Sequence, residues 1–218
     1  MIISGEDVTT WGDTSDGPII YLHVFEGDGG DVWTRCQELG CPDFSLVAIK
    51  PPDWDDALSP WPSEPISNDG RSCGGHASDQ LALLTEQIMP VVEAQRSTPP
   101  WSGIAGYSLA GLLAAWSPFA TRAFARVASV SGSLWYPGFI DFVRLHEPLR
   151  TPDRAYLSLG SKEAHAGNRM MRSVGEATQA LHELCQARGV ETVFVKNPGS
   201  HFRETALRTA RGIAWLLR

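Results

Sequence analysis

The sequence lacks several features that would mark particular classes of protein. No run of lysine and arginine interrupts its 218 residues, and the formal net charge is −7. This balance argues against nucleic acid or an anionic membrane as a partner. No apolar run approaches the length that spans a bilayer, and the first residues have neither the basic nor the long apolar segment of a secretory signal. We therefore expect a cytoplasmic protein without a nucleic-acid or membrane partner.

Cysteine is also scarce, and its spacing excludes the common uses of this residue. The four cysteines, Cys36, Cys41, Cys73 and Cys185, form no Cys-x-x-Cys pair. Histidines and carboxylates likewise show no spacing typical of metal ligands. We expect free structural thiols, no metal and no cofactor.

What the sequence has instead is an alternation of apolar and amphipathic segments. Near-continuous apolar runs predict strands buried on both faces of a parallel sheet, at residues 18–25, 45–50, 102–107, 126–131, 154–160 and 192–196. A weaker strand at 8–11 is expected at a sheet edge. Segments with one apolar face predict helices, at 31–39, 78–95, 137–146, 168–188 and 202–217. Strands that alternate with helices over 218 residues predict one α/β domain of three layers, with a doubly wound and mostly parallel sheet.

One strand-to-helix junction has the pattern of a nucleophile elbow, Gly106-Tyr107-Ser108-Leu109-Ala110. Small residues on both sides of a serine allow a strand to reverse sharply into a helix and expose the hydroxyl. The strict motif ends in glycine, and alanine is still small enough. The backbone N–H of Leu109, at the helix start, can then face a developing oxyanion. The alternative is a glycine-rich turn that only packs tightly.

Two further residues follow later strands, in the order that a serine triad of this fold requires. Functional loops leave the carboxyl ends of strands at one edge of the sheet. Glu163 follows the strand 154–160, and His201 alone among six histidines lies between the last strand and the last helix. His201 is the candidate base and Glu163 the candidate acid that orients it. Alternatively, His201 caps a surface helix and Glu163 belongs to an exposed charged turn.

Two loops are candidates for completing the site. The turn at residues 25–30 is rich in glycine, which lets a backbone amide approach a substrate oxygen, so we place the second oxyanion donor at Gly27 or a neighbour. The irregular segment 51–75 holds five prolines together with Trp54 and Trp61, and a loop of this length predicts a functional cover over the rim of the active site. We expect Trp54, Trp61 and Tyr107 to contact substrate.

Several motifs together resemble the esterase family of the α/β-hydrolases that includes enterochelin esterases and S-formylglutathione hydrolases. They lie at residues 18–22, 74–90, 106–111, 129–135, 159–163 and 197–201. The resemblance implies the α/β-hydrolase fold, with Ser108 as nucleophile, Glu163 as acid and His201 as base. It also implies that Ser133 and Trp135 lie beside the substrate pocket.

These residues predict a serine hydrolase that cleaves a small-molecule carboxylic ester through an acyl-enzyme. The tryptophans favour an uncharged or aromatic ester over a phosphorylated one, although each could equally belong to the core. An acyltransferase or thioesterase on the same scaffold is an alternative, and so is a hydrolase-like protein that only binds. The sequence indicates no oligomeric state.

Overall fold

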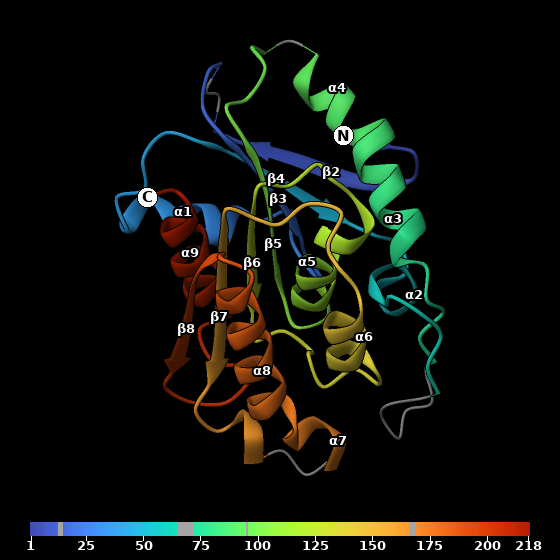
Figure 1. Ribbon diagram of the computed structural model, residues 1–218. Coiled ribbons are helices and arrows are strands. Elements are labelled where there is room, and N and C mark those ends of the chain that lie inside the picture. Colours follow the sequence, from blue (N-terminus) through green and yellow to red (C-terminus); the bar gives the residue numbers. More distant parts are fainter. Residues whose placement is uncertain (13–14, 65–71, 95, 166–168) are drawn as a thin grey trace.

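One twisted sheet of eight strands crosses the molecule in the computed structural model, which describes residues 1–12, 15–64, 72–94, 96–165 and 169–218 (Figure 1). Its strand order is β1-β2-β4-β3-β5-β6-β7-β8. The strands are β1 (Ile2–Ile3), β2 (Glu6–Trp11), β3 (Ile19–His23), β4 (Ser45–Lys50), β5 (Ser102–Tyr107), β6 (Arg126–Val130), β7 (Arg154–Gly160) and β8 (Glu191–Asn197). From β4 to β8 all neighbours pair in parallel, whereas β1, β2 and β4 pair antiparallel. The mostly parallel sheet is confirmed, but β2 is not the edge strand that we expected, since β1 lies outside it.

Helices cover both faces of the sheet, as a doubly wound fold requires. They are α1 (Gly30–Glu38), α2 (Trp54–Leu58), α3 (Ala77–Leu83), η1 (Leu84–Ile88), α4 (Met89–Glu93), α5 (Leu109–Ala120), α6 (Phe139–Leu145), η2 (Glu163–His165), α7 (Arg169–Arg172), α8 (Val174–Ala187) and α9 (Thr205–Leu216). Helices α1 and α9 share one apolar cluster with the sheet, and α3, α5, α6 and α8 share the other. The central strands therefore bury both of their faces, which explains their near-continuous apolar sequences.

The helix at α5 is apolar on every side, and residues 109–118 are all buried. It lies against β5 and β6 beneath the other helices of its face (Figure 1). A helix of this composition is stable only inside a protein, so the junction that it forms with β5 is held by packing from all directions. This rigidity positions the residue between them, Ser108.

Two segments predicted as continuous helices are interrupted. The segment predicted at 78–95 contains α3 and α4 with the π-helical turn η1 between them, and η1 ends two residues before Pro90. Proline lacks the N–H that would continue the α-helical hydrogen-bond ladder, and wider turns are a usual adjustment. Similarly, residues 168–188 contain α7 and α8.

The segment 51–75 begins with the short helix α2 and continues to an isolated antiparallel bridge between Ser63 and Cys73. Residues 65–71 of this segment lie outside the described part of the chain. The four cysteines are free thiols.

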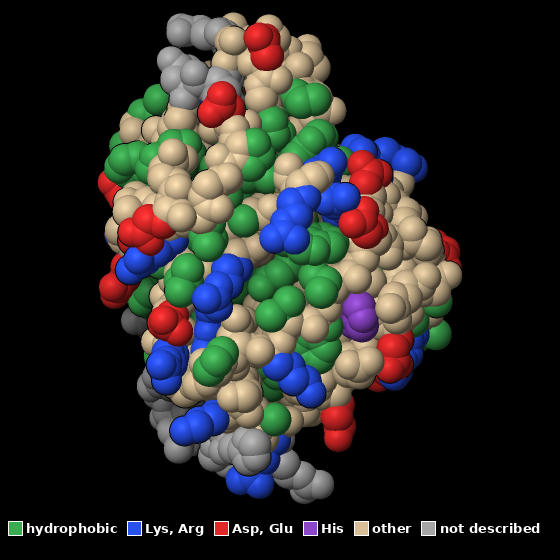
Figure 2. Space-filling view, turned by 90° about the vertical axis from the view of Figure 1, so that its left-hand side faces the viewer, with side chains coloured by type: hydrophobic (Ala, Val, Ile, Leu, Met, Phe, Trp, Pro, Cys, Tyr) green, Lys and Arg blue, Asp and Glu red, His purple; other side chains and the backbone are tan. Residues whose placement is uncertain are grey.

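Acidic, basic and hydrophobic side chains are interspersed over the face on the left of Figure 1, which carries α1 and α9 (Figure 2). In the described residues, no helix has the length and apolar character needed to cross a membrane.

Candidate active site

Ser108 lies at the tip of a sharp turn between β5 and α5. Its backbone has φ 58° and ψ −119°, a conformation that residues other than glycine rarely adopt. The turn is tight because Gly106 passes so close to Ala110 that a Cβ on Gly106 would collide with it. The N–H of Ser108 donates to the carbonyl of Val130 at 3.1 Å, which ties the turn to β6. The structure thus has the strained elbow that the motif predicts.

Three side chains from the ends of three strands meet at this turn. Nε2 of His201 lies 3.0 Å from Oγ of Ser108, and Nδ1 of His201 donates to Oε2 of Glu163 at 2.7 Å. Glu163 is buried, while 29% of the His201 side chain is exposed. The structure therefore brings together the three residues predicted from chain order, in the geometry of a nucleophile, a base and an orienting acid.

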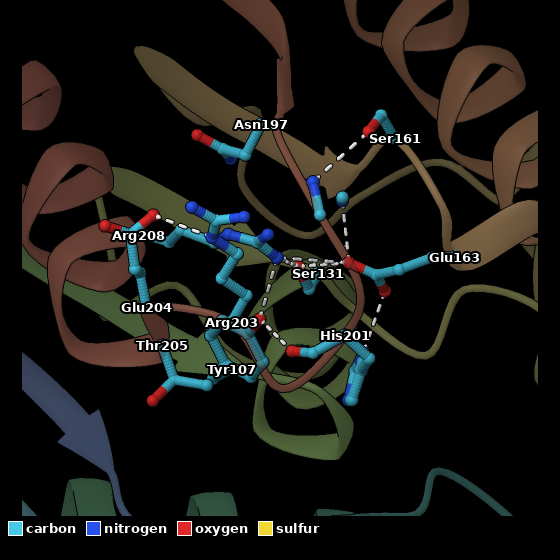
Figure 3. A network of polar contacts seen from close by, with 12 residues as sticks. Tyr107, Ser131, Ser161, Glu163, Asn197, His201, Arg203, Glu204, Thr205 and Arg208 are labelled. Carbon is cyan, nitrogen blue, oxygen red and sulfur yellow. Dashed lines mark hydrogen bonds and ion pairs between the residues drawn. The ribbon is translucent and has the colours of Figure 1, made fainter.

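The carboxylate of Glu163 is surrounded by donors. Its Oε1 accepts from the Ser131 hydroxyl at 2.8 Å and from the Gly160 amide at 2.6 Å (Figure 3). Burial raises the pKa of Glu163, but the hydrogen bond and charge of His201 and the donors on Gly160 and Ser131 outweigh it, so the pKa is lowered from its ordinary value. The ionised form is the one that can hold His201 in a single tautomer and stabilise its protonated form.

A buried arginine completes this network, and the sequence motifs gave no role to it. Arg208 comes from α9. Its Nη1 lies 3.4 Å from Oε1 of Glu163 and donates to the hydroxyl of Tyr107 at 3.2 Å (Figure 3). Tyr107 in turn donates to the carbonyl of His201 at 2.5 Å. The sequence signal that could have pointed to Arg208 is a charged residue among the apolar residues of the last helix, since charged residues are rarely buried without a partner.

A cavity of about 630 Å³ opens beside Ser108 and His201. Aromatic side chains from three separate segments border it, namely Phe25, Trp54 and Phe202. Phe25 and Trp54 pack edge to face with 5.4 Å between ring centroids. Among the described residues that border the cavity, none is lysine or arginine. The space is suited to an uncharged and at least partly apolar ligand.

Two backbone regions can supply donors to an oxyanion. Leu109 is the first residue of α5, and its N–H has no partner within the described chain. Phe25 and Glu26, from the turn after β3, border the cavity, and their N–H groups are also without a partner in that part of the chain. Gly27 borders a separate hollow near Lys50. The amides nearest to the cavity are therefore those of the neighbours of Gly27.

The remaining predicted contacts fall in different places. Ser133 is buried with its Oγ 3.5 Å from that of Ser108, and Tyr107 and Trp54 border the cavity. Trp61 instead packs against Tyr136 and Phe142 and donates to the carbonyl of Pro137. Trp135 borders another hollow, of about 260 Å³, between α6 and α8. A substrate contact by any of these five residues remains a prediction.

Comparison with known proteins assigns the fold. No family model matches the chain. An IroE-like serine hydrolase from Shewanella oneidensis has a TM-score of 0.75 at 17% identity, over 93% of this chain and 71% of that one. The siderophore hydrolase EstA from Aspergillus nidulans has a TM-score of 0.73 at 19% identity, over 97% and 89% of the two chains. The fold is that of the α/β-hydrolases.

In this chain the elbow follows β5, the glutamate follows β7 and the histidine follows β8. The expected fold is confirmed, as is the resemblance to siderophore esterases at the level of fold. In sequence, the uncharacterized protein YbbA of Bacillus subtilis (strain 168) is 26% identical over 185 residues, covering 81% of this chain and 74% of that protein. Within the described residues, no group of three or more histidine, cysteine or acidic side chains could hold a metal ion.

Proposed function

We propose that the protein is a serine hydrolase that cleaves carboxylic esters of small molecules through an acyl-enzyme. The observation that carries this proposal is the hydrogen-bonded chain from Glu163 through His201 to Ser108, at 2.7 and 3.0 Å, beside a cavity. A serine hydroxyl needs a base to become a nucleophile at neutral pH, and His201 is within reach of its proton.

The reaction proceeds in two stages. His201 takes the proton of Ser108 as Oγ attacks the ester carbonyl, and the oxyanion is held by the N–H of Leu109 and by an amide of the turn after β3. The ionised carboxylate of Glu163 stabilises the imidazolium that forms. His201 then gives its proton to the leaving alcohol and activates a water molecule, which releases the acid and frees Ser108.

The border of the cavity supports an uncharged or aromatic ester as substrate. Phe25, Trp54 and Phe202 offer apolar surface, and the acidic side chains of Glu26 and Asp31 would disfavour an anionic group. The similarity in fold to the siderophore hydrolase EstA supports hydrolysis of a small molecule.

Replacing Ser108 by alanine tests the proposal. We expect S108A to lose at least about 10³-fold in kcat on p-nitrophenyl acetate and butyrate, with its thermal unfolding unchanged. S117A is the matched control, because the hydroxyl of Ser117 lies inside α5 and donates only to the carbonyl of Ala114. Equal turnover by S108A and the wild type would overturn the proposal.

A further inference from the structure

Arg208 is a charged side chain at a position where packing alone would favour an apolar one. It lies in the second turn of α9 with 1% of its surface exposed, and it is among the largest fully buried side chains of the described chain. Gly212 and Leu216, about one and two turns further along the same side of α9, are also buried, and Leu216 belongs to the apolar cluster against the sheet. A buried guanidinium is costly unless it is paired and hydrogen-bonded, so its partners indicate what it is for.

The partners of Arg208 come from the carboxyl ends of four successive strands. Nη1 faces Tyr107 at the end of β5, Ser131 after β6 and Glu163 after β7, at 3.2, 3.5 and 3.4 Å respectively. Nη2 donates to the carbonyl of Pro198 after β8 at 2.7 Å. One planar guanidinium thus connects every segment that carries or supports a member of the Ser-His-Glu chain (Figure 3).

These contacts act on His201 from two sides. On its carboxylate side, Oε1 of Glu163 faces Arg208 and the other oxygen, Oε2, accepts from His201. On its backbone side, Tyr107 accepts from Arg208 and donates to the carbonyl of His201, and Pro198 lies in the same loop. Arg208 itself does not touch the cavity, because it is not among the residues that border it.

We propose that Arg208 is a positioning residue of the hydrolase, whose guanidinium holds Glu163 and the His201 loop so that His201 faces Ser108. This inference rests on the proposed function. Arg208 contacts neither substrate nor the reacting atoms, and it acts through Glu163 and Tyr107. Small losses of alignment between base and nucleophile lower the rate of the chemical step without weakening the binding of substrate.

Two substitutions of Arg208 separate this role from simple packing. R208Q removes the charge. R208K keeps the charge, but lysine has one terminal nitrogen in place of the two NH2 groups with which Arg208 reaches Glu163 and Pro198. We expect R208Q to lose about 10- to 100-fold in kcat on p-nitrophenyl butyrate, with KM within about twofold of the wild type. R208K should recover part of that loss. Active sites are counted from the burst of p-nitrophenol, so that misfolded protein does not lower the measured kcat.

R211Q is the matched control, because it removes an equal charge from the same helix at an exposed position whose contact is with Asn197. It should keep the kcat of the wild type. Wild-type kcat per active site in folded R208Q overturns the proposal, and where R208Q does not fold, wild-type kcat in R208K overturns it. If the wild type itself has no esterase activity, the proposed function fails independently of Arg208.

Hydrogen exchange tests the positioning role without any activity. In the wild type, the amides of residues 199–203 should exchange more slowly than in R208K or R208Q, because Arg208 holds this loop through the carbonyl of Pro198 and, by way of Tyr107, through His201. R211Q should exchange as the wild type does. Equal exchange of this loop in all four proteins would contradict the proposed role.

Discussion

Backbone strain at the level of single residues gathers around Ser108. Among the described residues, the non-glycine residues with positive φ are Ser4, Ser108, Ser131 and Glu204. Ser108 is the candidate nucleophile, Ser131 donates to Glu163, and Glu204 directly precedes α9. Such conformations cost on the order of 1–3 kcal/mol each and persist only where surrounding contacts enforce them. Three of the four thus lie where precise placement matters for the proposed chemistry.

His23, the last residue of β3, makes the stability of the folded protein depend on pH. It is buried, its Nε2 lies 3.2 Å from the amide nitrogen of Gln80, and its Nδ1 has no partner in the described chain. Burial lowers the pKa of His23 from its ordinary value of 6.5 to about 3. The neutral side chain therefore supports folding fully above pH 6.5, and this support is lost as the pH falls from 6.5 toward 3, because only the unfolded chain takes up the proton.

We expect the free energy of unfolding of the wild type to fall more steeply than that of H23L between pH 6.5 and 4.5, by a difference in slope that rises toward about 1.4 kcal/mol per pH unit at the lower pH. Urea unfolding at several pH values measures this difference in slope. H146N is the control, because His146 is exposed at the end of α6. Parallel pH profiles for H23L and the wild type would contradict a neutral buried His23.

At the scale of elements, the site follows from strand order. Ser108 and His201 are 93 residues apart, and His201 and Glu163 are 38 apart, yet β5, β6, β7 and β8 are successive neighbours in the sheet. Parallel neighbours bring their carboxyl ends to one edge, so the loops after them converge. The chain order of strands was therefore enough to predict which three residues meet.

Gly160, the last residue of β7, shows how closely these loops are packed. A Cβ there would lie 2.7 Å from Oε1 of Glu163, 2.7 Å from the carbonyl of Gly199 and 3.0 Å from Nη1 of Arg208. We expect G160A to lose at least about tenfold in kcat/KM on p-nitrophenyl butyrate, because Glu163 and the His201 loop must move apart.

The control for this prediction is G175A. A Cβ at Gly175, in α8, would meet only Ala164 at 3.7 Å, which is ordinary contact. Alanine should leave activity unchanged and stabilise the helix by about 0.5–1 kcal/mol. If G160A kept full activity, catalysis would not depend on the position that the Glu163 carboxylate has in this structure.

Elements without a regular pattern were predicted less well. Strands at 45–50, 102–107 and 154–160 have the predicted bounds, because long apolar runs specify both burial and period. The helix predicted at 78–95 is divided, since periodicity does not register a π-helical turn. Loop tryptophans carry no period at all, so nothing in the sequence distinguished Trp54, which borders the cavity, from Trp61, which packs between Tyr136 and Phe142.

At the scale of the whole molecule, the fold and the Ser-His-Glu chain could be predicted, whereas the support of that chain could not. The role proposed for Arg208 depends on its contacts at the carboxyl ends of four strands, which only the folded sheet brings together. The cavity likewise draws Phe25, Trp54 and Phe202 from three distant segments. Local patterns specify elements, and properties that arise between elements need the three-dimensional structure.

The central claim is that Ser108 is an activated nucleophile, and covalent labelling tests it most directly. A fluorophosphonate probe forms a bond from Oγ of an activated serine to phosphorus and releases fluoride. Intact mass spectrometry and peptide mapping of the wild type should show one probe per chain, on Ser108, and no label on S108A. A wild type that stays unlabelled, or that carries the label on another serine while Ser108 is unmodified, would contradict the account.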